Sequence, residues 1–107
     1  MKAVVVGSGG WGTALSQVLC DNGYDVYLWS HSTEKAVQMA ETRENPLLKG
    51  IRLPDSLHIT GDLACLEGAA LVVSAPPSFA VRDTGKKMAP WLRPATILVT
   101  VSNGLDL

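Results

Sequence analysis

Short apolar runs alternate along the chain with longer segments in which hydrophobic and polar positions are mixed. The runs Lys2–Val6 and 70–75 are β-branched and apolar on both faces, as expected for parallel strands that helices cover on both sides. Further strands are predicted at Asp25–Trp29, His58–Thr60 and 96–101.

The segment from about Gly10 to Asp21 has a helical pattern. Its apolar residues repeat at the spacing of a single helical face, and they are Trp11, Ala14, Leu15, Val18 and Leu19. Asn22-Gly23 follows, a signal for a left-handed residue at a helix end. We therefore predict a helix that lays this stripe against the sheet.

Two further helices are predicted. One runs from residue 33 to about 43, with Val37 and Ala40 facing inward. The other runs from about residue 78 to 88 and ends by Pro90. Each lies between two predicted strands.

The stretch between the second predicted helix and the strand predicted at 70–75 is less regular. Residues 47–57 contain Gly50 and Pro54 and are predicted to leave the sheet as an irregular excursion. Asp62 is placed to cap a helix of one or two turns, which Gly68 would close.

This order of strands and helices predicts an α/β fold, with a doubly wound, mainly parallel sheet and right-handed crossovers. Residues 1–107 are enough for a single three-layer domain. The carboxyl ends of parallel strands share an edge, where ligands bind in open α/β sheets. Four loops are predicted to meet there: 7–12, 30–32, 76–78 and 102–104.

The first of these loops has the spacing G-x-G-x-x-G, made by Gly7, Gly9 and Gly12 around Ser8, Gly10 and Trp11. In a Rossmann-type fold these glycines make the tight turn, let a pyrophosphate approach the backbone, and let the helix pack close to the strand. The helix adds N–H groups and a positive dipole end. The motif predicts a dinucleotide cofactor, the alternative being a glycine-rich turn without a ligand.

The second loop follows Trp29, where a dinucleotide fold usually places an acid on the ribose 2′-hydroxyl. This chain has Ser30, His31 and Ser32 there, which do not repel an anion. The sequence therefore favours NADP over NAD, although NADP sites commonly have an arginine that is missing here. The alternative is that Ser32 or Thr33 only caps a helix and His31 is a solvated turn residue.

Two prolines, Pro76 and Pro77, follow the fourth strand. They form a stiff wall with few donors, which could press on a flat ring such as nicotinamide. The other interpretation is that Pro77 starts the next helix and Ser78 helps to cap it. The two are compatible.

Composition narrows the classes of partner. The net charge of −1, the pI of about 6.0 and nine scattered Lys and Arg residues argue against nucleic acid. Cys20 and Cys65 are far apart in apolar surroundings, so we expect free thiols, no metal site and a cytoplasmic location. No apolar run approaches the length of a membrane span. His58 has no second ligand nearby and is expected to be structural.

Several segments taken together resemble one family, the bacterial-type NAD(P)-dependent glycerol-3-phosphate dehydrogenases. The resemblance extends over essentially the whole chain, in order, and rests on residues 7–15, 28–31, 43–45, 53–57, 75–78 with Arg82, and 102–106. It implies reversible hydride transfer between a nicotinamide cofactor and the pair dihydroxyacetone phosphate and sn-glycerol 3-phosphate, which supplies phospholipid precursors. It also implies cofactor contacts at Gly10, Trp11, His31 and Ser32.

This sequence departs from the family pattern in three places. Asn103 stands where the family has a lysine expected to contact cofactor and substrate, and an amide cannot supply that point charge. Residues 45–54 are one residue shorter than usual. Family members continue into a helical domain with the catalytic lysine, whereas this chain stops at Leu107, so we expect no catalytic residue here and no turnover.

Three other functions are also compatible with this sequence. The chain could be a non-catalytic dinucleotide-sensing module or a diverged paralogue in which Asn103 has ended catalysis. Another NADP-dependent reductase with the same N-terminal fold is a third interpretation. Apolar surface that a second domain would cover makes self-association, as a homodimer, a further hypothesis.

Overall fold

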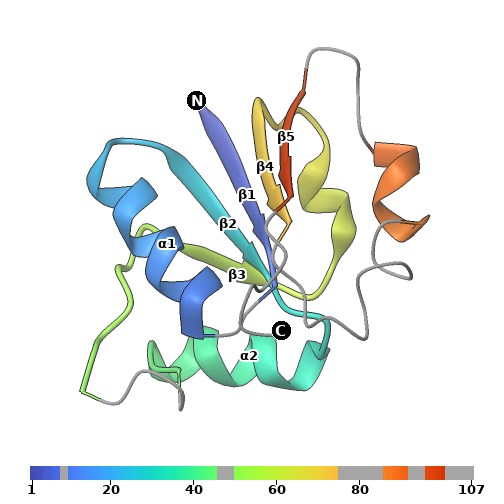
Figure 1. Cartoon of the computed structure of the whole chain (residues 1–107). Helices are drawn as coiled ribbons and strands as arrows, with labels where there is room; N and C mark the ends of the chain where they lie inside the picture. Colours follow the sequence, from blue (N-terminus) through green and yellow to red (C-terminus); the bar gives the residue numbers. More distant parts are fainter. Residues whose placement is uncertain (8–9, 46–49, 75–85, 92–95, 101–107) are drawn as a thin grey trace, which may run out of the picture.

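Five parallel strands form one sheet in the order β3-β2-β1-β4-β5 (Figure 1). The computed structural model describes residues 1–7, 10–45, 50–74, 86–91 and 96–100. Its strands are β1 (Lys2–Val6), β2 (Asp25–Trp29), β3 (His58–Thr60), β4 (Leu71–Ser74) and β5 (Ile97–Thr100). All five point their carboxyl ends to the same edge, as the sequence predicted.

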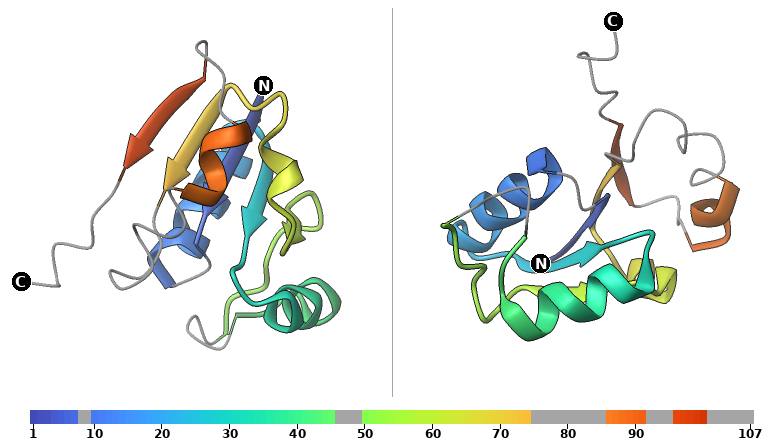
Figure 2. Two further views of the ribbon diagram at one scale, coloured as in Figure 1. Left: turned by 90° about the vertical axis from the view of Figure 1, so that its right-hand side faces the viewer. Right: turned by 90° about the horizontal axis from the view of Figure 1, so that it is seen from below.

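Helical segments connect the strands on both faces of the sheet. They are α1 (Gly10–Asp21), α2 (Thr33–Thr42) and the 3-10 helices η1 (Leu63–Leu66) and η3 (Ala89–Trp91), with residues 86–88 also helical. Figure 2 shows α1 on one side of the sheet, and η1 and η3 on the other. The doubly wound, three-layer α/β fold predicted from the sequence is confirmed.

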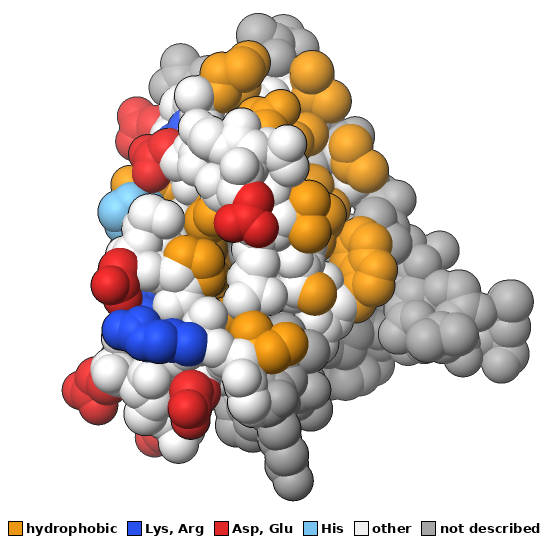
Figure 3. All heavy atoms as spheres, turned by 90° about the vertical axis from the view of Figure 1, so that its left-hand side faces the viewer, with side chains coloured by type: hydrophobic (Ala, Val, Ile, Leu, Met, Phe, Trp, Pro, Cys, Tyr) orange, Lys and Arg blue, Asp and Glu red, His pale blue; other side chains and the backbone are white. Residues whose placement is uncertain are grey.

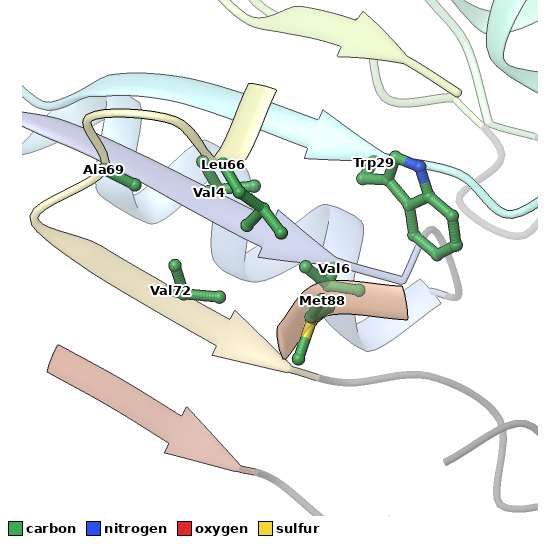
Figure 4. Packing of buried hydrophobic residues seen from close by; sticks show 7 residues of the cluster. All are labelled: Val4, Val6, Trp29, Leu66, Ala69, Val72 and Met88. Carbon is green, nitrogen blue, oxygen red and sulfur yellow. The ribbon is translucent and has the colours of Figure 1, made fainter. Parts of the chain in front are cut away.

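Side chains alternate from the strands into two separate cores. Val4 and Val6 of β1 point to the η1 side and pack with Trp29, Leu66, Ala69, Val72 and Met88 (Figure 4). Val5 points to the other side, with Val26, Leu28, Met39, Leu53, Leu57 and Val73. The central strand is apolar on both faces because it contributes to both cores.

The helix ends are set by the residues that the sequence indicated. Ser32 caps α2, its Oγ accepting a hydrogen bond from the Lys35 N–H at 3.2 Å. Asp62 caps η1 in the same way, accepting from the Ala64 N–H at 2.9 Å, and Gly68 follows with φ 77°. Most of the helix predicted over 78–88 lies outside the described residues.

The buried faces of the helices differ from the prediction. In α1 the fully buried residues are Gly12, Thr13 and Ser16, whereas Trp11 and Val18 are more than half exposed. Small residues let the helix approach the sheet closely, and Leu15 and Leu19 of the apolar stripe pack against the core beside them.

The predicted inward face of α2 is wrong at Val37. That side chain is 52% exposed, while Ala36 and Met39 are buried. Figure 3 shows hydrophobic side chains gathered on the α1 side of the molecule, part of the surface that the apolar pattern would have buried.

Arg43 holds the irregular segment that follows α2. It adopts the left-handed conformation at the helix end, with φ 57°, and its carbonyl accepts a hydrogen bond from the Leu53 N–H at 2.7 Å. Its guanidinium donates to the carbonyl oxygens of Leu57 at 2.6 Å and Pro54 at 3.2 Å. The 50–57 segment is thereby tied to the sheet edge beside α1 and α2.

Candidate functional site at the carboxyl edge of the sheet

The glycine turn after β1 is tightly built. Gly7 has φ 124°, a conformation that favours glycine, and its N–H donates to the Trp29 carbonyl oxygen at 2.9 Å. A side chain at Gly12 would collide with the Gly7 carbonyl oxygen. The first and third glycines therefore have the roles that the motif predicts, while Ser8 and Gly9 lie outside the described residues.

The amino end of α1 begins directly after this turn, at Gly10 and Trp11. The first-turn N–H groups of an α-helix have no partner within the helix and present a positive dipole end. The first turn of α1 contains no acidic residue that would neutralise that end. The amino end of α1 is therefore suited to a phosphate group, such as the pyrophosphate of a dinucleotide.

Three consecutive residues after β2 divide into two structural roles and one exposed group. Ser30 is 1% exposed, and its Oγ accepts from the Ser32 N–H at 3.3 Å, while Ser32 caps α2. The cap is the alternative that the sequence allowed for Ser32. His31 is exposed, and its ring lies edge-on to the Trp29 ring, with 6.3 Å between the ring centroids. His31 is therefore the side chain of the three that is best placed to meet a ligand.

Asn45, in the 43–45 segment of the family resemblance, has a buried contact that its sequence neighbours do not predict. It is 1% exposed, and its Nδ2 donates to Oγ1 of the buried Thr13 at 2.8 Å. Thr13 follows Gly12 in α1, so this bond links the segment after α2 to the helix turn that packs on Gly7. The partners are 32 positions apart in the sequence, so no local pattern reveals the pair.

A groove of about 630 Å³ opens at the carboxyl ends of β2 and β3. Its lining comes from Trp29 and His31, from α2, from the 59–63 segment and from Lys87. It lies on the same edge as the glycine turn, beyond β2. The size lies within the range usual for small-molecule sites.

The remaining predicted site residues, Pro76, Pro77 and Asn103, lie outside the described residues. Both strands that precede them, β4 and β5, end on the edge where the glycine turn lies. Their contacts with cofactor stay predictions.

The cysteines are free thiols, and burial raises the pKa of both. For Cys65 the value is about 11, against the opposing influence of the Lys2 ammonium. Within the described ranges, no three His, Cys, Asp or Glu side chains gather in a way that could hold a metal ion. The helices of that same part of the chain are all too short or too polar to cross a membrane.

A family model and the curated relatives of this chain point to the same protein family. Residues 2–107 match the model of the NAD-dependent glycerol-3-phosphate dehydrogenase N-terminus. A glycerol-3-phosphate dehydrogenase [NAD(P)+] of Bacillus velezensis is 41% identical over an alignment of 107 positions, which covers 98% of this chain and 31% of that protein. The chain thus spans about a third of the length of the curated relatives it matches.

Solved structures agree at the level of the fold. The glycerol-3-phosphate dehydrogenase of Coxiella burnetii superposes with a TM-score of 0.89 at 30% identity, covering 96% of this chain and 32% of that one. A ketopantoate reductase from Ralstonia eutropha reaches 0.80 at 20% identity over 99% and 35%. The second likeness shows a shared fold alone.

Proposed function

We propose that this chain, which belongs to the family of NAD-dependent glycerol-3-phosphate dehydrogenase N-terminal regions, binds NAD(P) at the carboxyl edge of its sheet. The observation that supports this most directly is the packing of Gly12 on the Gly7 carbonyl, which brings the amino end of α1 against the turn. The pyrophosphate would accept hydrogen bonds from N–H groups of the turn and of Gly10 and Trp11.

The adenosine ribose is proposed to lie beside His31. The residues after β2 provide no carboxylate at Ser30, His31 or Ser32, and a carboxylate there would repel a 2′-phosphate. The exposed imidazole can donate a hydrogen bond to that phosphate. This supports a preference for NADP over NAD.

The whole protein is proposed to interconvert sn-glycerol 3-phosphate and dihydroxyacetone phosphate by hydride transfer from or to the nicotinamide. Support comes from the relatives' names and from the family. We propose that the 107 residues alone bind cofactor without turnover, since Asn103 stands at one lysine position of the family and the resemblance places the catalytic lysine in a helical domain outside these residues. The small phosphorylated substrate therefore belongs to the whole protein.

Two features bear on the surroundings of the protein. Free thiols at Cys20 and Cys65 support a reducing compartment, the cytoplasm. Apolar side chains exposed on α1 and β5 support self-association as a homodimer.

A fluorescence titration of the 107-residue chain with NADH and with NADPH tests cofactor binding. We expect saturable binding of both, tighter for NADPH, and a His31→Glu variant that binds NADPH at least roughly tenfold more weakly while keeping NADH. Absence of saturable binding by either cofactor would overturn the proposed function. A preference for NADH would overturn only the 2′-phosphate argument.

A further inference from the structure

The first turn of α1 is held from outside the helix by a buried hydrogen bond. Gly12, Thr13 and Ser16 form the buried face of α1. The Ser16 hydroxyl bonds within the helix, donating to the Gly12 carbonyl oxygen at 2.9 Å. The Thr13 Oγ1 instead accepts from the Asn45 Nδ2 at 2.8 Å, and Asn45 belongs to the segment after α2. Thr13 is therefore a point at which another part of the chain fixes α1.

Asn45 follows a part of the backbone that is anchored to the core. Two residues before it, Arg43 ends α2, where its N–H donates to the Met39 carbonyl oxygen at 2.8 Å and its own carbonyl accepts from the Leu53 N–H at 2.7 Å. The Arg43 guanidinium donates to the Leu57 carbonyl oxygen at 2.6 Å. Met39, Leu53 and Leu57 are all buried in the core. The Asn45 amide, itself 1% exposed, therefore has a fixed place relative to that core.

The close contact between the two glycines leaves part of the placement of α1 undetermined. Gly12 lets the helix approach the Gly7 carbonyl oxygen, because a Cβ at Gly12 would collide with it. Van der Waals contact limits the distance between two groups but has little directional preference. A hydrogen bond depends on angle as well as distance and weakens steeply when it is bent. The Asn45–Thr13 bond can therefore fix the rotation of α1, which the glycine contact alone cannot.

We propose that Asn45 is a positioning residue for the dinucleotide, and that its bond to Thr13 fixes the direction of the Gly10 and Trp11 N–H groups. These N–H groups are the proposed donors to the pyrophosphate, so this inference rests on the proposed binding of NAD(P). They lie in the same helical turn as Thr13, and a rotation of α1 at Thr13 turns them with it. Because hydrogen bonds weaken with angle, a small rotation lowers the affinity for the pyrophosphate without unfolding the chain.

Cofactor titration of Asn45→Ala tests this role. The variant is first shown by circular dichroism to be folded in the titration buffer. We expect its affinities for NADPH and NADH to fall by the same factor, roughly 3- to 10-fold, as for about one weakened hydrogen bond. The factor is shared because both cofactors contain the pyrophosphate. The ratio of the two affinities therefore stays unchanged in Asn45→Ala, whereas His31→Glu changes it.

A ligand without a pyrophosphate separates positioning from a general loosening of the chain. 2′-AMP contains the adenosine and the 2′-phosphate that are proposed to lie beside His31. Its binding is followed by NMR through the ring signals of His31, and we expect Asn45→Ala to bind it as the unmodified chain does. Val72→Ala is the control for lost stability, because it removes core methyl groups on the sheet face opposite α1. It should keep the affinity for all three ligands.

Substitutions at Thr13 test the same bond from its other partner. Thr13→Ser keeps the hydroxyl that accepts from Asn45, and we expect it to keep the NADPH affinity within about twofold. Thr13→Val has nearly the same shape without the hydroxyl, and it should lose affinity as Asn45→Ala does. The double variant should lose no more than either single variant, since all three lack the same bond. If Asn45→Ala does not fold, Thr13→Val provides the test.

Two results overturn the role of Asn45 and leave the proposed function standing. One is that folded Asn45→Ala and Thr13→Val bind NADPH as tightly as the unmodified chain. The other is that Asn45→Ala loses affinity for 2′-AMP by the same factor as for NADPH. If the unmodified chain binds neither NADPH nor NADH, the proposed function itself fails, and the role of Asn45 fails with it.

Discussion

At the scale of single residues, Gly12 shows how little space the site tolerates. A Cβ there meets the Gly7 carbonyl oxygen, a backbone atom that cannot swing aside. We expect Gly12→Ala to destabilise the fold by about 1–3 kcal/mol, as overpacking does. NADPH affinity should fall at least roughly tenfold, because α1 moves off the turn. Urea unfolding and the NADPH titration measure the two effects.

Gly68→Ala is the matched control for Gly12→Ala. Gly68 precedes β4 and so lies at the amino ends of the strands, away from the carboxyl edge. Its φ is +77°, and a Cβ there would have no atom within 4 Å. Its substitution should destabilise by about 1–2 kcal/mol through the backbone alone and leave NADPH affinity unchanged. Equal affinities for the two variants would contradict the role given to Gly12.

The Asn45–Thr13 hydrogen bond makes a separate prediction. Asn45→Ala leaves buried Thr13 without this donor, and we expect a loss of about 1–3 kcal/mol in the free energy of unfolding. In a double-mutant cycle with Thr13→Val, the coupling should be about 0.5–3 kcal/mol. Additive losses, measured by urea unfolding, would mean that the bond contributes no stability.

Cys65 predicts how stability depends on pH. Burial raises the pKa of its thiol to about 11 in the folded chain, whereas an unfolded cysteine ionises near about 8.5. Above that lower value the unfolded chain loses a proton that the folded chain keeps. Stability from this group is therefore complete below about pH 8.5 and falls as pH rises toward 11.

The predicted loss of stability is checked by measuring urea unfolding midpoints between about pH 8 and 11, for the unmodified chain and for Cys65→Ala. The variant should lose part of the alkaline decline, since the other ionising groups are common to both proteins. An identical decline in both would show that Cys65 does not contribute.

At the scale of elements, α2 offers a paired test of helix orientation. Met39 is 1% exposed in the core, whereas Val37 is 52% exposed on the same helix. Met39→Ala should destabilise by about 2–5 kcal/mol, and Val37→Ala should stay within about 0.5 kcal/mol. The reverse ranking in urea unfolding would mean that α2 is rotated from the described orientation.

The strands were predictable within a residue or two, because a parallel strand buried on both faces is apolar throughout. β1, β2 and β3 match their predicted bounds, and β4 begins one residue later than predicted, while residue 75 lies outside the described residues. Helix orientation was less predictable. α1 packs through Gly12, Thr13 and Ser16, which a pattern of large apolar residues does not reveal.

The site was predictable where a local motif makes it. The glycine turn and the caps at Ser32 and Asp62 follow from short-range chemistry. The Asn45–Thr13 bond depends on a contact between distant segments, and no local pattern encodes it.

At the scale of the whole molecule, β5 is one of the two outer strands of the sheet as far as the structure describes it. Its Ile97 and Val99 are 63% and 42% exposed. An open apolar edge favours pairing with another chain. We expect the 107-residue chain to associate as its concentration rises in sedimentation velocity.

Ile97→Lys should weaken that association, because a charge on the strand would have to be buried in the contact. Val37→Lys places the same charge on exposed α2 and should leave association unchanged. A single monomeric species at every concentration would refute the prediction.

The central place of β1 has a consequence for synthesis on the ribosome. One neighbour, β2, is the next strand along the chain and ends at Trp29, but the other, β4, ends only at Ser74. At roughly 5–20 residues per second, translation from Gly7 to Ser74 takes on the order of 3 to 14 s. During that interval one side of the most apolar strand stays unpaired, so the nascent chain is a natural client for chaperones that cover strand edges.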